Sequence, residues 1–127
     1  TTDLMATFAA MAGLSVPNDR ILDSIDLSLV LSGQSTNPRK HLFYYRGYEL
    51  MAVRMGPWKI HYQKQGSYGT QPQGLTKCEP PELYHLYQDP SERYNIASEH
   101  PDVLARGQML VAEHRARLRP APTRLEH

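Results

Sequence analysis

The spacing of apolar residues changes twice along this chain, and these changes constrain its fold more than any other feature. From residue 4 to residue 12, apolar side chains recur every three or four positions, which is typical of an amphipathic helix. Between His41 and Tyr87, outside residues 64–81, they alternate, which is typical of half-buried strands. Helical spacing returns from Pro101 to about Leu118. A helix, a group of strands and a second helix predict an α+β fold.

The middle of the chain predicts a small antiparallel sheet of about four strands. The expected strands cover residues 41–46, 50–55, 58–63 and 83–87. Gly56-Pro57 suits a type II′ hairpin turn between the second and the third strand. Residues 64–81, which are rich in Gly, Pro and Gln, are expected to form a long irregular loop. The helix over residues 101–118 is expected to cover one face of the sheet.

The first 33 residues predict a separate helical segment. Thr2 is a suitable N-cap for a helix that runs to about Ala12, and Gly13 ends it. Residues 21–33 predict a turn followed by a short helix that Gly33 ends. The apolar face of the first helix requires a partner surface.

Charge and composition exclude several classes of protein. The 127 residues hold 14 Lys plus Arg and 13 Asp plus Glu, interspersed, so nucleic acid is not an expected partner. The longest apolar runs are far shorter than the roughly 20 residues that span a bilayer, so no membrane span is expected. The single Cys78 allows neither an internal disulfide nor a Cys-cluster zinc site.

No constellation for catalysis or metal binding is evident. The six histidines show no HxH or HxxxH pair, which favours structural or solvated roles over metal ligation, and no metal site is expected. Lys59 and His61 project from one face of a strand, where they could meet an anion or simply be solvated. Cys78 could be a reactive thiol, an inert one, or the partner of a cysteine outside this chain. No residue is assigned a catalytic role.

Four segments, in order, resemble the formylglycine-dependent sulfatases of the alkaline phosphatase superfamily, close to the arylsulfatase A-like branch. Residues 2–14 resemble the family's helix T-D-L-x-P-T-L-A-A-L-A-G, and residues 22–31 its segment L-D-G-x-D-L-S-P-x-L. Residues 52–62 resemble its hairpin A-V-R-x-G-x-x-K-x-H-F, and residues 82–96 its segment x-L-Y-D-L-x-x-D-P-x-E-x-x-N-L.

The resemblance implies the C-terminal part of such an enzyme. Residues 1–33 would be the helical end of the large domain, and residues 34–122 the C-terminal four-stranded subdomain with the helix 101–118. Residues 125–127 resemble the remnant of a purification tag. The family hydrolyses sulfate esters of aryl, sugar or sulfolipid compounds. This chain would contribute scaffold and the rim of the substrate pocket, without being catalytically competent alone.

The resemblance also assigns roles to individual residues. The family converts the Cys of a C-x-P-S-R motif to formylglycine and uses a calcium or magnesium ion. Cys78 is followed by Glu-Pro-Pro, so no cofactor is expected in this chain. His61, Lys64 and Tyr68 are expected to line the pocket rim, and Cys78 lies where arylsulfatase A-like members place a half-cystine bonded to the large domain. Ser24 replaces a family Gly and is expected to strain a left-handed turn.

The expected partners are the N-terminal sulfatase domain and a sulfate-ester substrate, with self-association through the apolar face of the first helix if that domain is absent. The compartment is unknown from these residues, although the family suggests a secreted, periplasmic or lysosomal protein. Two alternatives remain open: part of a related phosphodiesterase or phosphonate hydrolase, and a stand-alone binding or assembly module.

Overall fold

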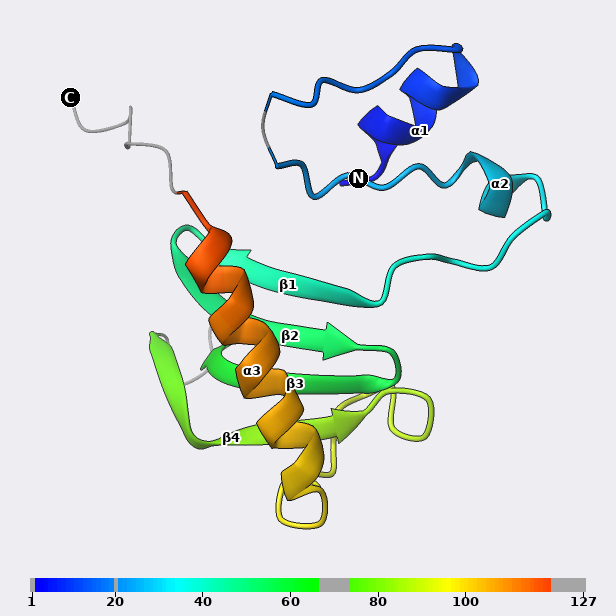
Figure 1. Cartoon of the computed structure of the whole chain (residues 1–127). Coiled ribbons are helices and arrows are strands. Elements are labelled where there is room, and N and C mark those ends of the chain that lie inside the picture. The colour runs from blue at the N-terminus through cyan, green and yellow to red at the C-terminus, as the bar shows by residue number, and fades with distance from the viewer. Residues whose placement is uncertain (1, 20, 67–73, 120–127) are drawn as a thin grey trace. The chain divides into compact units, whose positions relative to one another are not determined.

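A computed structural model describes residues 2–19, 21–66 and 74–119 (Figure 1). The chain divides into two compact units, residues 1–40 and residues 41–127. Tyr68 and residues 125–127, which the sequence singles out, lie outside the described residues. Within the described part of the chain, no helix combines the length and the apolar character needed to cross a membrane.

The second unit is a four-stranded antiparallel sheet with one helix across it, as expected for an α+β fold. Its strands lie in the order β1-β2-β3-β4, and Figure 1 shows the helix α3 lying across one face of the sheet. The element bounds are β1 His41–Arg46, β2 Glu49–Met55, β3 Trp58–Gln65, β4 Leu75–His85 and α3 Pro101–Arg117. The C-terminal helix therefore matches its predicted range to within one residue.

The core lies between the sheet and α3. Strand register aligns Phe43, Val53, Ile60 and Leu83 in one row across the four strands. Val53, Ile60 and Leu83 are fully buried. Alternation of apolar residues along each strand places this row on a single face, which is the pattern that the sequence displays.

On the helix side of the core, Gly107 lies between two buried valines. Val103 and Val111 are buried on α3 together with Gly107. A Cβ atom at Gly107 would lie 2.2 Å from Cδ1 of Ile60 and 3.3 Å from Cε of Met55. The missing side chain at this position therefore allows the helix to approach β3 closely.

The predicted loop over residues 64–81 is wrong at both of its ends. β3 continues to Gln65 and β4 begins at Leu75, and the pairing Gln65↔Leu75 joins the two strands. The register shifts between His61 and Gln63, which lets the strands resume pairing beyond the irregularity. β4 is an edge strand, so its prolines remove no hydrogen bond needed inside the sheet. Pairing with β3 thus overrides the local preference for a loop.

The first unit holds two short helices, α1 Leu4–Met11 and α2 Ser28–Leu31. Gly13 and Gly33 follow them with φ of 70° and 75°, so both glycines end helices as predicted. The predicted N-cap is wrong: the cap is Asp3, and its side chain makes no capping hydrogen bond. Asp3 instead accepts a hydrogen bond from the Ile25 amide (2.9 Å) and forms an ion pair with Arg39.

The segment around residues 24–27 runs along α1. Ser24 Oγ accepts a hydrogen bond from the Ala6 amide (3.0 Å), and Thr7 Oγ1 accepts one from the Leu27 amide (3.1 Å). Ser24 has no positive φ, so the expected strain at this position is absent. Of the apolar residues predicted to form one face of α1, the four large ones are 47–67% exposed; they are Leu4, Met5, Phe8 and Met11.

Candidate functional site on the polar face of the sheet

The face of the sheet opposite α3 carries charged and polar side chains. Lys59 and His61 alternate with the buried Ile60 along β3, so they project from the other face. Across to β4, Lys59 pairs with Tyr84 and His61 pairs with Glu82 in the strand register. Four chemically distinct groups therefore lie together on this face.

A loop that follows β4 returns to this face, and two side chains shape it. Asp89 Oδ2 accepts hydrogen bonds from the amides of Arg93 (2.6 Å) and Tyr94 (2.8 Å), which closes a turn. Asn95 Oδ1 accepts from the amides of Leu83 (3.1 Å) and of Ala97, which ties the loop to β4. These residues belong to the Asp-Pro-Ser-Glu-Arg-Tyr-Asn segment, whose turn-forming character the sequence indicates.

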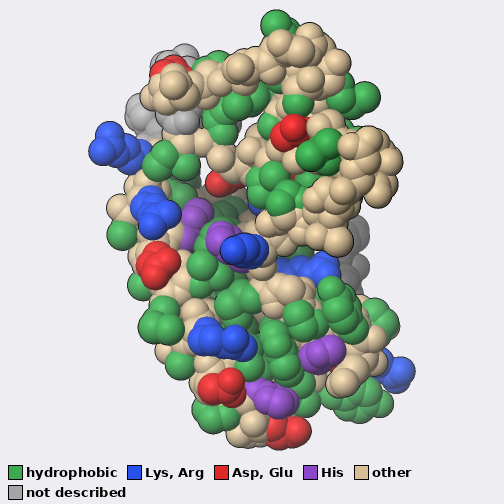
Figure 2. All heavy atoms as spheres, turned by 45° about the vertical axis from the view of Figure 1, so that its right-hand side comes forward, with side chains coloured by type: hydrophobic (Ala, Val, Ile, Leu, Met, Phe, Trp, Pro, Cys, Tyr) green, Lys and Arg blue, Asp and Glu red, His purple; other side chains and the backbone are tan. Residues whose placement is uncertain are grey.

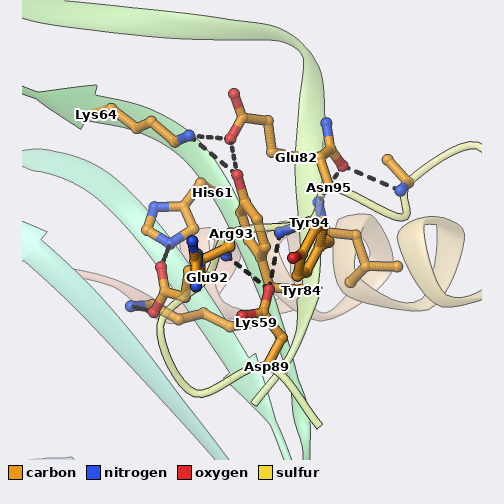
Figure 3. A network of polar contacts seen from close by, with 12 residues as sticks. Lys59, His61, Lys64, Glu82, Tyr84, Asp89, Glu92, Arg93, Tyr94 and Asn95 are labelled. Carbon is orange, nitrogen blue, oxygen red and sulfur yellow. Dashed lines mark hydrogen bonds and ion pairs between the residues drawn. The ribbon is translucent and has the colours of Figure 1, made fainter.

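Glu92 lies inside this turn and bridges two residues of β3 (Figure 3). Its Oε1 accepts a hydrogen bond from Lys59 Nζ at 2.6 Å, and its Oε2 lies 2.6 Å from His61 Nε2. Glu92 has a φ of 53° and is the only non-glycine residue with a positive φ among the described residues. The left-handed backbone thus holds the carboxylate against the sheet at a conformational cost.

A second cluster lies beside the first. Lys64 forms an ion pair with Glu82, and its Nζ donates a hydrogen bond to Tyr84 Oη (3.1 Å). Tyr84 Oη donates to Glu82 Oε2 (2.5 Å). The Lys64 ammonium also lies 5.4 Å from the centre of the Tyr84 ring. Lysine, tyrosine and glutamate therefore hold one another in place.

Each lysine of these two clusters is paired with a glutamate. Burial by itself would raise the pKa of Glu92, but hydrogen bonds from Lys59 and His61 outweigh it and lower that pKa. Burial lowers the pKa of His61, with smaller contributions from the Lys59 and Lys64 charges, against the opposing hydrogen bond to Glu92. His61 is therefore neutral at pH 7 while Glu92 is ionised.

The second cluster is ionised as well. Burial alone would lower the pKa of Lys64, but its hydrogen bonds with Glu82 and Tyr84 raise it above the ordinary lysine value. Burial alone would raise the pKa of Glu82, but its hydrogen bonds with Lys64 and Tyr84 outweigh burial and lower that pKa. Burial and the Glu82 contact raise the pKa of Tyr84, which keeps its phenol protonated. Each of these two clusters therefore pairs a lysine with a glutamate.

The structure brings together two of the four residues to which the resemblance assigns roles. His61 and Lys64 lie on the polar face, and Tyr68 lies outside the described residues. Cys78 is half-buried on β4 as a free thiol, and burial raises its pKa. Sequence reasoning missed Glu92 and Glu82, because opposite charges far apart in the chain give no local pattern. The sequence indicated only that Lys59 and His61 could meet an anion, and it did not indicate that this anion is a carboxylate of the same chain.

The other histidines that the structure describes in the second unit contact aromatic rings. His114 stacks on Phe43 with ring centres 3.7 Å apart, and Trp58 contacts the rings of His85 and His100 at 4.6 and 4.8 Å. Within the described ranges, no group of three or more His, Cys, Asp or Glu is arranged to hold a metal ion. The residues present therefore do not fit the divalent cation that the resemblance implies for the family's enzymes.

Comparison with known proteins identifies the family. Residues 37–127 match the family described as the C-terminal region of aryl-sulfatase, and the chain belongs to this family. The chain is 40% identical to human arylsulfatase A over 120 residues, which cover 80% of this chain and 24% of that protein. It is 34% identical to mouse N-acetylgalactosamine-6-sulfatase, over 97% of this chain and 28% of that protein. The chain thus spans about a quarter of the length of these relatives.

Solved structures show the same fold. A structure from work on glycosaminoglycan metabolism by Bacteroides thetaiotaomicron superposes with a TM-score of 0.71 and 26% identity, over 91% of this chain and 24% of that one. The sulfatase PsFucS1 from Pseudoalteromonas sp. superposes with a TM-score of 0.75 and 18% identity, over 90% of this chain and 25% of that one. The chain is therefore the C-terminal region of an arylsulfatase-like sulfatase.

Proposed function

We propose that this chain completes a sulfatase that hydrolyses sulfate esters of aryl, sugar or sulfolipid compounds. The observation that carries the proposal is the family match over residues 37–127. Relatives named arylsulfatase and N-acetylgalactosamine-6-sulfatase support sulfate esters as the substrate class. Since the chain spans about a quarter of these relatives, we assign it a supporting part in a longer enzyme.

The chemistry is assigned to the rest of that enzyme. The sequence contains no C-x-P-S-R motif for formylglycine, and the described residues provide no cluster for a calcium or magnesium ion. The nucleophile and the cation therefore belong to an N-terminal sulfatase domain, which is the partner of this chain. The chain alone is expected to have no sulfatase activity.

The contribution of this chain to substrate binding is a pocket rim formed by His61, Lys64 and Tyr68. His61 and Lys64 support this proposal because they lie on one face of β3, just before residues 67–73. Each is held by a carboxylate, so its position is set before a substrate arrives. A rim of preset donors and acceptors would discriminate among the groups that carry the sulfate ester.

Residues 1–33 are proposed to belong to the large domain of the enzyme. The exposed apolar residues of α1 support this assignment, because Phe8 and Met11 are 60% and 67% exposed. Figure 2 shows hydrophobic side chains, in green, exposed at the surface beside charged ones. Cys78 is proposed to pair with a cysteine of the large domain, and its free, half-buried thiol is compatible with that pairing.

The test uses the complete enzyme, expressed from the reading frame that contains this chain. His61→Ala and Lys64→Ala are expected to change kcat/KM unequally for an aryl sulfate and a sugar sulfate, while thermal unfolding reports any loss of folding. Arg117→Ala, on the exposed end of α3, serves as a matched charge-removing control. Unchanged kinetics for both substrates in both variants would refute the rim, and a complete enzyme inactive on every sulfate ester would refute the function.

A further inference from the structure

His61 has two ring nitrogens, and the structure gives them different surroundings. Nε2 lies 2.6 Å from Glu92 Oε2. Figure 3 shows the other ring nitrogen pointing away from Glu92. Among the described residues, Glu92 is the only hydrogen-bond partner of the His61 ring. The His61 side chain is 15% exposed, so it remains partly accessible from the polar face.

The charge of Glu92 decides which ring nitrogen carries the proton. An ionised carboxylate only accepts hydrogen bonds, so Nε2 must be the donor. Lys59 occupies the second oxygen of the same carboxylate at 2.6 Å and keeps it ionised. In a neutral imidazole with the proton on Nε2, Nδ1 has a free lone pair and can only accept.

The charges around His61 determine what kind of ligand suits that lone pair. The groups that face it are Lys59 and Lys64 on β3, Glu82 and Tyr84 on β4, and Glu92 on the loop. Both lysines are already paired with carboxylates. Beside His61, an anion would therefore meet lysines that are already paired and a lone pair that cannot donate to it, whereas a hydroxyl can donate to that lone pair without a charge penalty.

We infer that Glu92 is a positioning residue that fixes the proton of His61 on Nε2, so that Nδ1 accepts a hydrogen bond from a neutral hydroxyl group of the ligand. The inference rests on the proposed rim, and it names the ligand chemistry of one rim residue. It assigns no proton transfer to His61. A hydroxyl-rich sugar is the ligand class that this arrangement fits, in preference to an additional sulfate or carboxylate group.

The structure also predicts how the arrangement can be inverted. In Glu92→Gln, the Lys59 ammonium can bond only to the side-chain carbonyl oxygen, because an ammonium donates and never accepts. The amide NH₂ then faces Nε2 of His61 and requires an acceptor there. The proton of His61 must move to Nδ1, which changes Nδ1 from an acceptor to a donor.

Nitrogen-15 NMR of the chain, with its histidine rings labelled with that isotope, tests the position of the His61 proton directly. The nitrogen without a proton resonates far downfield, and it is expected to be Nδ1 in the native chain and Nε2 in Glu92→Gln. Glu82→Gln removes an equal charge from the same face without touching the His61 hydrogen bond, so Nδ1 should stay downfield. Amide spectra verify that each variant is folded. A native Nε2 lone pair, or an unchanged pattern in Glu92→Gln, would overturn the inference.

Ligand preference is tested on the same chain with galactose and sodium sulfate at equal ionic strength. Galactose is expected to shift the Nδ1 signal of the native chain, whereas sulfate, which only accepts hydrogen bonds, is expected to leave it unchanged. In Glu92→Gln, where Nδ1 donates, sulfate is expected to shift this signal as well. A response of the native chain to sulfate, or no response to galactose, overturns the assigned ligand class. These measurements need no catalysis, so their failure is distinct from a failure of the complete enzyme to hydrolyse sulfate esters.

Discussion

Replacing Glu92 with alanine and with glycine separates two effects that the native residue combines. Both substitutions remove the carboxylate that bridges Lys59 and His61. Only glycine removes the conformational cost of a φ of 53°. Because the lost contacts are the same, the difference between the two variants measures the backbone strain at this position.

The structure gives the size and the sign of each effect. Lys59 and His61 are 18% and 15% exposed, so losing their common carboxylate leaves two largely buried polar groups without it. Glu92→Ala is therefore expected to lower the free energy of unfolding by roughly 2 kcal/mol. Left-handed backbone costs a non-glycine residue about 1 kcal/mol, so Glu92→Gly is expected to be about 1 kcal/mol more stable than Glu92→Ala.

Urea unfolding, followed by Trp58 fluorescence and by circular dichroism, measures these differences in the full chain. Arg93 is the matched control, because it is the exposed neighbour and has no positive φ. At position 93 glycine should be less stable than alanine, since only the entropy of the unfolded chain changes there. If alanine were also the more stable choice at position 92, the carboxylate would not be held by a strained backbone.

Three further predictions follow from the core, from His61 and from the loop. Gly107→Ala places a Cβ 2.2 Å from Ile60 Cδ1 and should destabilise the chain by about 1 kcal/mol despite the gain in helix propensity. Ile60→Val removes that methyl group and should relieve the clash, so additive effects of the two substitutions in a double-mutant cycle would contradict this packing. The pKa of His61 is lowered on folding, so the unfolded chain binds its proton first, and the free energy of unfolding should fall as the pH drops from about 7.5 to 5.5. His61→Gln should flatten that slope in urea titrations, and an unchanged slope would exclude His61 as its source. Asn95→Ala removes the acceptor for the Leu83 amide and should speed its hydrogen exchange at a cost of about 1–3 kcal/mol, whereas Asn95→Asp, which keeps the oxygen, should not.

The sequence predicts the helix-covered face of the sheet well, because one physical rule governs it. Apolar residues alternate along each strand, and Val53, Ile60 and Leu83 all reach the core that α3 covers. The extension of β4 back to Leu75 could not be predicted in the same way. Its pairing with Gln65 depends on a partner strand, and the local residues favour a loop.

The polar face follows a different rule, and the sequence predicts only half of it. Alternation places Lys59 and His61 on that face, as expected, but it does not identify their partner. Glu92 lies 31 residues beyond His61, in a segment that the sequence correctly indicates as a turn. Whether that turn points the carboxylate toward the sheet depends on the left-handed φ at Glu92 and on the Asp89 hydrogen bonds, and neither follows from residue types alone.

The contact that positions His61, a residue of the proposed rim, also holds the loop on the sheet, and this affects how a substitution of His61 is interpreted. Removing His61 leaves Glu92 short of one partner, so a loss of activity in that variant can come from a displaced loop instead of from a lost substrate contact. Glu92→Gln separates the two causes, because it keeps the size of the side chain and changes which ring nitrogen of His61 donates. If the loop of Glu92→Gln stays in place and sulfate now binds at Nδ1, while Glu82→Gln, which removes the same charge, shows no such binding, this face recognises ligands through hydrogen-bond direction and not through charge.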